Sequence, residues 1–196
     1  MIRILLFINI LFITILNYGC NPAGMVASGG ATTMIIAEGE RSPGTIIDDA
    51  TIKAFISSKF LSSENNLFFN IDVTVLEGRV LLTGIVNAQE TRIDAVRKVW
   101  GVQGVQEVIN EIEVGERPTL KEYSNDLWIN TQVKGIAAKT LGLRALAYNF
   151  ETIKGRVFIA GITTEKELID QLIGAVKNIK GVKEIVNYVI IKESKE

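Results

Sequence analysis

The sequence predicts an α/β protein (α+β in its layering) made of two tandem copies of one small domain. We expect each copy to be a two-layer sandwich, with two helices on a three-stranded mixed sheet. The first observation behind this prediction is an internal repeat with a constant offset, which pairs Gly78 with Gly155 and Gly84 with Gly161 without a gap. The second is the order of hydrophobic patterns in each copy, which reads helix, strand, strand, helix, strand.

The composition indicates a folded protein and excludes several kinds of site. Hydrophobic residues make up 47% of the 196-residue chain, charged residues make up 22%, and the net charge is −1. A nucleic-acid-binding protein normally carries a clear basic excess, so we expect no nucleic-acid partner. The chain has no histidine and one cysteine, Cys20, which excludes a His/Cys metal cluster, a histidine-dependent triad and an internal disulfide within one chain.

We therefore expect no metal, no cofactor and no enzymatic activity. A carboxylate-dependent hydrolase is the remaining enzymatic alternative, because paired acids can catalyse hydrolysis without histidine. Asp48 and Asp49 are adjacent acids, and their place before an apolar helix pattern is more typical of helix capping than of catalysis.

The first nineteen residues have the pattern of an export signal. After Arg3, an apolar run of signal-peptide length extends to Leu16, which is short for a transmembrane helix. The run ends at Gly19-Cys20, which resembles the lipobox of bacterial lipoproteins, although Asn17 stands where that pattern usually has leucine. The resemblance implies removal of residues 1–19 and diacylation of Cys20, for example with palmitate. An ordinary cleaved signal and an uncleaved anchor are the alternatives.

Residues 20–45 are expected to form the lipidated N-terminus and a flexible tether, because they are rich in Gly, Ala, Ser and Thr and lack a hydrophobic period. Asn21 follows the cysteine in place of the aspartate that retains such lipoproteins at the inner membrane. We therefore expect an outer-membrane anchor, with the rest of the chain facing the periplasm.

The first copy is expected at residues 46–115. Asp49 is predicted to cap a helix that runs to about Leu61, with Ile52, Phe55, Ile56 and Phe60 at helical spacing. Strands at 71–75 and 80–82 are close enough to form a hairpin, with Gly78 in its turn and Gly84 at the end of its second strand. A helix over 88–99, with Trp100 on its core side, and a strand over 105–114 complete the copy.

The second copy is expected at residues 124–193, after a linker at 116–123. It repeats the pattern with helices at 126–141 and 164–178 and strands at 148–153, 156–160 and 182–191. Gly155 and Gly161 take the roles of Gly78 and Gly84, and Arg79 and Arg156 are read as solvated strand starts. The linker is short, and each copy is near the lower size limit for independent stability, so we expect the two copies to pack together.

Two repeated motifs carry a family resemblance. Gly78-Arg79-Val80-Leu81-Leu82-Thr83-Gly84, followed by a helix and then Gly104-Val105-Gln106-Glu107-Val108-Ile109-Asn110, resembles the BON domain, and the second copy keeps the frame. A lipobox before two such domains, together with Ser124-Asn125-Asp126-Leu127-Trp128-Ile129, is similar to the dual-BON outer-membrane lipoproteins. This resemblance implies binding of anionic phospholipid through the first helix of the second domain, support of envelope integrity and association with the outer-membrane protein assembly machinery.

The charge distribution agrees with a lipid contact in the second copy alone. Residues 46–120 contain 7 Lys and Arg against 11 Asp and Glu, whereas residues 121–196 contain 12 against 9. A basic surface favours anionic headgroups. Ordinary divergence between duplicates is the alternative explanation.

The helix over 126–141 gives the geometric argument. Ile129, Val133, Ile136 and Thr140 are predicted to form its core face, which leaves Leu127 and Trp128 off the core. The predicted phospholipid-binding residues are these two and the small and basic residues beside them: Leu127, Trp128, Thr131, Lys134, Gly135, Ala138 and Lys139. Packing of Trp128 against the first copy is the structural alternative, and a protein-interaction scaffold for an outer-membrane assembly factor is the alternative function.

Overall fold

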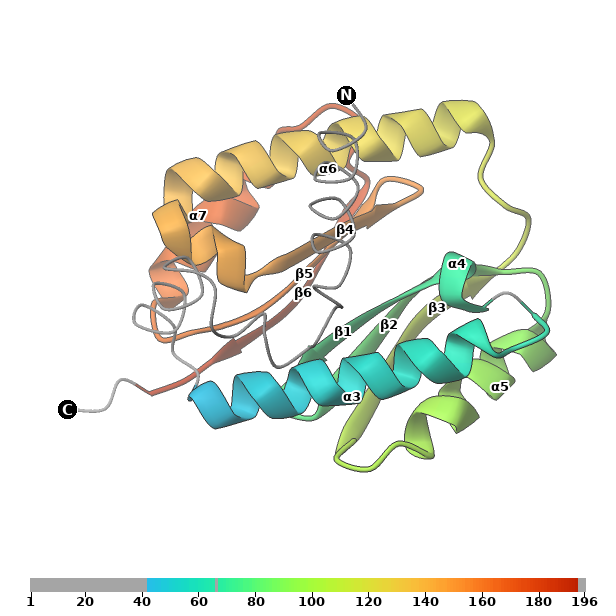
Figure 1. Cartoon of the computed structure of the whole chain (residues 1–196). Helices are drawn as coiled ribbons and strands as arrows, with labels where there is room; N and C mark the ends of the chain where they lie inside the picture. Colours follow the sequence, from blue (N-terminus) through green and yellow to red (C-terminus); the bar gives the residue numbers. More distant parts are fainter. Residues whose placement is uncertain (1–41, 66, 194–196) are drawn as a thin grey trace, which may run out of the picture.

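The computed structural model describes residues 42–65 and 67–193 and contains two three-stranded sheets. The sheets face each other in the middle of the molecule, and the long helices cover their outer faces, which gives four layers (Figure 1). This arrangement confirms the predicted fold class, with helices on a mixed sheet in each of two tandem domains.

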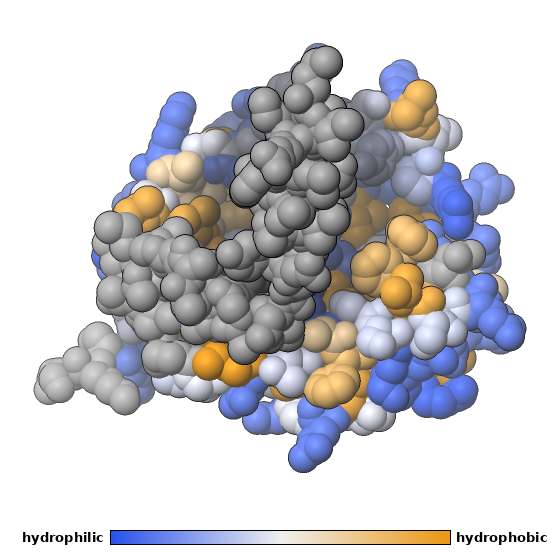
Figure 2. Space-filling view, in the orientation of Figure 1, coloured by the Kyte–Doolittle hydropathy of each residue, from blue (hydrophilic) through white to orange (hydrophobic). Residues whose placement is uncertain are grey.

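The first domain contains three helices and the sheet β1-β2-β3. Helix α3 (Pro43–Leu61) and the one-turn helix α4 (Leu67–Asn70) precede the hairpin of β1 (Ile71–Leu76) and β2 (Arg79–Val86). Helix α5 (Gln89–Trp100) then leads to β3 (Glu107–Val114). Strand β2 pairs antiparallel with β1 and parallel with β3, so β2 is central. Apolar side chains gather at the surface over α4 (Figure 2).

The second domain repeats this order. Helix α6 (Leu120–Leu141) and the 3₁₀ helix η1 (Gly142–Ala147) lead into β4 (Asn149–Ile153) and β5 (Arg156–Thr163). Helix α7 (Lys166–Val176) connects β5 to β6 (Glu184–Ile191). The sheet order is β4-β5-β6, with the same antiparallel and parallel pairs as in the first domain.

Both long helices begin earlier than predicted, six residues before Asp49 and six residues before Asp126. Helix α3 is capped by the Ser42 hydroxyl, which accepts a hydrogen bond from the Thr45 backbone N–H, so Pro43–Thr45, expected in the tether, are helical. Helix α6 has a capping box, in which Thr119 and Glu122 each accept from the other's backbone N–H. The hydrogen bonds that the Glu122 carboxylate accepts from the backbone N–H and the hydroxyl of Thr119 lower the pKa of Glu122.

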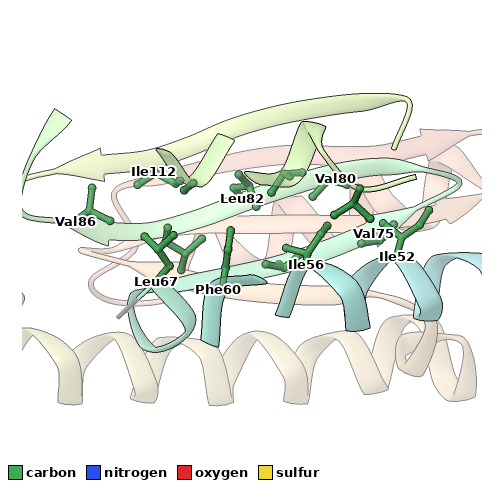
Figure 3. Packing of buried hydrophobic residues seen from close by; sticks show 14 residues of the cluster. Ile52, Ile56, Phe60, Leu67, Val75, Val80, Leu82, Val86 and Ile112 are labelled. Carbon is green, nitrogen blue, oxygen red and sulfur yellow. The ribbon is translucent and has the colours of Figure 1, made fainter. Parts of the chain in front are cut away.

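The core of the first domain lies between its helices and its sheet. The buried side chains of α3, α4 and the strands meet in one layer (Figure 3), among them Ile52, Ile56, Phe60, Leu67, Val80 and Leu82. Two residues predicted for the core are exposed instead, Phe55 at 60% and Trp100 at 53%. Among the described residues, the hydrophobic clusters of both domains extend from Ile52 to Ile190, so the fragment 42–196 includes all of them.

The two sheets pack directly against each other through their helix-free faces. Leu81 and Ile85 of β2 are buried in clusters with Ala160, Ile162 and Phe158 of β5. The central strands are therefore covered on both faces, which explains their almost continuous apolar sequences. The expectation that the domains pack together is confirmed by this interface.

An ion-pair cluster joins the rims of the two sheets. Arg156 donates to Glu111 and Glu113 of the first domain, at 3.3 and 3.2 Å, and to Glu184 of its own domain at 2.7 Å. The Tyr188 hydroxyl also donates to Glu111, and burial together with this bond raises the pKa of Tyr188 to about 12. The expectation of a solvated Arg156 is therefore wrong. Its partners lie 28, 43 and 45 residues away in the sequence, so local spacing does not reveal them.

The predicted signal peptide (1–19), Cys20 and most of the tether lie outside the described residues. Within the described ranges, no helix combines the length and the apolarity that crossing a membrane requires.

Candidate functional site

Helix α6 forms an outer layer of the second domain and presents one face to its sheet. The buried residues of that face include Ile129, Val133, Ala137 and Leu141. Ile136 and Thr140, predicted for the core face, are only half-buried. The buried stripe therefore runs slightly to one side of the predicted one, and the opposite side of the helix is left to solvent.

Asp126 fixes the first half of α6 to the β4–β5 hairpin. Its carboxylate accepts hydrogen bonds from the backbone N–H groups of Lys154 at 2.7 Å and Gly155 at 2.8 Å. Asp49 accepts in the same way from Glu77 and Gly78, at 2.8 and 2.9 Å. The prediction that Asp49 caps its helix is wrong: both aspartates lie inside their helices and bind the hairpin turns.

The backbone conformation of the hairpin turns explains why a carboxylate lies beside each of them. In the first domain, Glu77 and Gly78 both have positive φ values, 54° and 76°, as the two central residues of a type I′ turn do. Such a turn directs both central N–H groups away from the hairpin ladder, and one carboxylate satisfies both of them. A left-handed glutamate is uncommon, so the turn depends on its partner as well as on Gly78.

Gly84 and Gly161 lie inside strands β2 and β5, not at their ends as predicted. A Cβ atom on Gly84 would lie 2.1 Å from the carbonyl oxygen of Asn70, and one on Gly161 would lie 2.3 Å from the ring of Tyr148. Because glycine has no side chain, the segment that leads into the first hairpin strand can pass in close contact with the second hairpin strand at these two positions.

The α6 patch comprises the residues predicted to bind lipid, and the structure leaves all of them exposed: Leu127, Trp128, Thr131, Lys134, Gly135, Ala138 and Lys139. Leu127 is 57% exposed and Trp128 is 47% exposed. A Cβ on Gly135 would meet no atom within 4 Å, so no neighbouring element requires a glycine at this position. Trp128 is thus left open on the outer layer rather than buried against the first domain.

Two exposed residues beside the patch were missed from the sequence. Leu120 and Tyr123, which are 82% and 59% exposed, lie seven and four residues before Leu127 on the same side of α6. Their helical spacing was readable in the sequence. It was overlooked because the helix was expected to begin at Asp126.

The α6 patch combines apolar, small and basic side chains. Its titratable side chains are the two lysines, which are exposed. Among the described residues, no group of three or more Asp, Glu, Cys or His side chains is placed to hold a metal ion. The indole of Trp128 suits the boundary between apolar and polar layers, and lysines suit an anionic partner.

Comparison with known proteins gives a family match over most of the chain. The family model described as BON domain matches twice, at residues 48–116 and at residues 125–193. Each match begins inside the first long helix of a domain and ends just after its third strand.

Several relatives match across both domains. A protein of Anaplasma centrale described as uncharacterised is 38% identical over 150 residues, which cover 76% of this chain and 98% of the relative. The outer membrane lipoprotein DolP of Haemophilus influenzae is 29% identical over 174 residues, covering 88% of this chain and 89% of DolP. A 21 kDa hemolysin of Actinobacillus pleuropneumoniae is 29% identical, covering 76% of this chain and 78% of the relative.

Proposed function

The chain belongs to the BON domain family, and we propose that it is an outer-membrane lipoprotein. In this proposal it binds anionic phospholipid through helix α6 and supports envelope integrity. The observation that carries the proposal is the exposure of Trp128 and Leu127 on the outer layer, beside Lys134 and Lys139. The similarity to the outer membrane lipoprotein DolP supports the location in the envelope.

The chemistry of the α6 patch matches a membrane interface. An indole ring is favoured at the level of the lipid headgroups, and a leucine beside it can enter the acyl boundary. The small side chains of Thr131, Gly135 and Ala138 let the helix backbone approach the headgroups closely. Each well-placed lysine contributes about 1 kcal/mol of attraction to an anionic surface.

The patch is specific to the second domain, although the two domains are duplicates. The repeat places Thr51 of α3 at the position of Trp128 and Ser57 at the position of Lys134. The fold itself therefore does not require the tryptophan or the lysine. This supports a division of roles, in which the second domain touches the membrane and the more acidic first domain faces away from it.

We further propose that acylation of Cys20 anchors the chain in the outer membrane on its periplasmic side. An α6 patch alone gives reversible binding, whereas two acyl chains together with a basic patch give stable anchoring. The proposed role is non-enzymatic binding, and a component of the outer-membrane protein assembly machinery is the proposed protein partner. A scaffold without lipid affinity is the competing function.

Co-sedimentation with lipid vesicles tests the proposed function. We expect the fragment 42–196, which has no acylation site, to bind vesicles that contain phosphatidylglycerol but not vesicles of phosphatidylcholine alone. Trp128→Ala and Lys139→Glu should each weaken this binding about tenfold, because each removes or reverses one interfacial contact. Lys139 is preferred to Lys134 for this test because Lys134 also lies within electrostatic range of Glu151.

The chain offers a matched control in its other tryptophan. Trp100 on α5 is as exposed as Trp128, at 53%, but lies in the first domain. Trp100→Ala should leave vesicle binding unchanged. Equal losses from the two tryptophan variants, or no vesicle binding by the folded fragment, would favour the scaffold instead.

A further inference from the structure

A cleft of about 1000 Å³ opens between the two domains on the side of their linker. Helix α4 and the start of β1 form one wall, and the first half of α6 together with β4 forms the other. Arg117 and Pro118 of the linker also line it. The α6 patch and this cleft share only Leu127, so the cleft is a separate feature from the proposed membrane contact.

The rim of the cleft is apolar and exposed. Phe68 and Phe69 of α4 are 44% and 76% exposed, and their rings meet edge to face at 5.3 Å. Leu120 and Tyr123 of α6 lie across from them on the opposite wall. Figure 2 shows the apolar surface over α4 at the side of this opening. A set of large apolar side chains left in water on both walls of one cleft is typical of a binding site.

Two residues of the wall formed by α6 and β4 carry buried polar atoms. Thr152 is only 6% exposed, and its hydroxyl has no hydrogen-bond partner among the described residues. The buried side-chain oxygen of Asn130 likewise has none. Most buried polar groups in proteins are paired, so the hydrogen bonding of this wall of the cleft is incomplete.

The same part of the cleft is negatively charged. Glu151 of β4 and Asp72 of β1 line it from the two domains, and Asp126 adds a third carboxylate that already binds the hairpin turn. Burial, reinforced by Asp72, raises the pKa of Glu151 to about 7, whereas Lys134 of α6 acts in the opposite direction. A bound cation would relieve this repulsion and would favour the ionised carboxylate.

Two edge strands border the cleft. Strands β1 and β4 each end their sheet, with no further strand paired on the outer side within the described part of the chain. Edge strands offer backbone N–H and C=O groups to an added extended chain. A peptide backbone can use these groups, whereas a lipid tail cannot.

We propose that this inter-domain cleft binds an extended peptide segment of a partner protein, which places a lysine or arginine side chain between Glu151 and Asp72 and apolar side chains against the α4 and α6 rim. This site is independent of the membrane contact. It lets the protein hold a basic, apolar segment of another envelope protein while the outer face of α6 lies on the membrane.

Nuclear magnetic resonance titration of the fragment 42–196 tests this site. The probe is the peptide acetyl-Leu-Lys-Leu-Leu-amide, compared with peptides that carry norleucine or glutamate in place of the lysine. We expect saturable shifts of the backbone amides of Asp72, Asn130 and Glu151 with the lysine peptide. Binding of the other two peptides should be at least about tenfold weaker, because they leave the acidic floor without a cation.

Two further results follow if a cation enters beside Glu151. Glu151→Gln should weaken the lysine peptide about tenfold, and Phe69→Ala on the rim should weaken all three peptides alike. The affinity of the unmodified fragment should rise about tenfold from pH 6 to pH 8, because Glu151 must be ionised to hold the cation. Glu151→Gln should abolish this pH dependence, and thermal unfolding verifies that each variant is folded.

The proposal is overturned by equal binding of the lysine and glutamate peptides, by shifts confined to the outer face of α6, or by no saturable shift in the folded fragment. Its failure is distinguishable from failure of the membrane contact. Trp128→Ala should leave the peptide titration unchanged, and Phe69→Ala should leave vesicle binding unchanged. Shifts of the cleft amides with phosphatidylglycerol micelles but not with the lysine peptide would assign the cleft to lipid and reject the peptide.

Discussion

Replacing Asp49 by alanine is expected to lower the free energy of unfolding by about 3 kcal/mol. The carboxylate accepts the backbone N–H groups of Glu77 and Gly78, and its loss leaves two donors of a tight turn without a partner in a largely buried place. Urea denaturation of the fragment 42–196, followed by circular dichroism, measures the change. Asp126→Ala should have a similar effect through the turn at Lys154 and Gly155.

The neighbouring acid provides the control for this prediction. Asp48 precedes Asp49 on α3 but is exposed, so Asp48→Ala should change the stability by less than about 0.5 kcal/mol. If the two variants were equally stable, the turn would not depend on the carboxylate. The account of the paired aspartates in both domains would then be wrong.

Glu151→Gln is expected to stabilise the protein at alkaline pH and to leave it unchanged in acid. Burial and Asp72 raise the pKa of Glu151 from 4.5 to about 7, so the folded state holds this proton more firmly than the unfolded chain does. Ionisation therefore costs no stability below about pH 4.5; the cost grows as the pH rises towards 7 and is complete above it. Glutamine resembles the protonated acid and avoids this cost.

The expected gain at pH 8 is about 2 kcal/mol. A full shift of this size corresponds to about 3 kcal/mol, and the part of the side chain that stays in water reduces it. Denaturation of both proteins at pH 4 and pH 8 gives the difference, and Glu64→Gln, at an exposed position, should show none. A gain that is equal at both pH values would mean that packing, not charge, causes it.

The repeat made most of the fold readable from the sequence. Because Gly78 and Gly155 could be aligned without a gap, each element of one copy supported the same element of the other. The four-layer packing was not predicted beyond the expectation that the copies pack together. The sequence did contain an indication of this packing, because β5 is apolar on both faces from Val157 to Ala160. Such a pattern is typical of a strand that is buried on both sides.

The site was predicted less completely because its main features are long-range. The exposure of Trp128 followed from helical periodicity, which is local. The binding of Asp126 to a turn 28 residues away could not be predicted from periodicity. An aspartate near the start of a helix is equally consistent with helix capping and with binding of a turn. The inter-domain cleft depends on how two sheets face each other, which no spacing in one copy reveals.

The most direct test of the proposed membrane contact is the fluorescence of Trp128 alone, in the Trp100→Phe variant of the fragment 42–196. Addition of phosphatidylglycerol vesicles should shift the emission to shorter wavelength, and brominated acyl chains should quench it, because the indole leaves water for the headgroup boundary. Phosphatidylcholine vesicles should have neither effect. An emission that stays unchanged with anionic vesicles, in a fragment that is folded, would contradict phospholipid binding through α6.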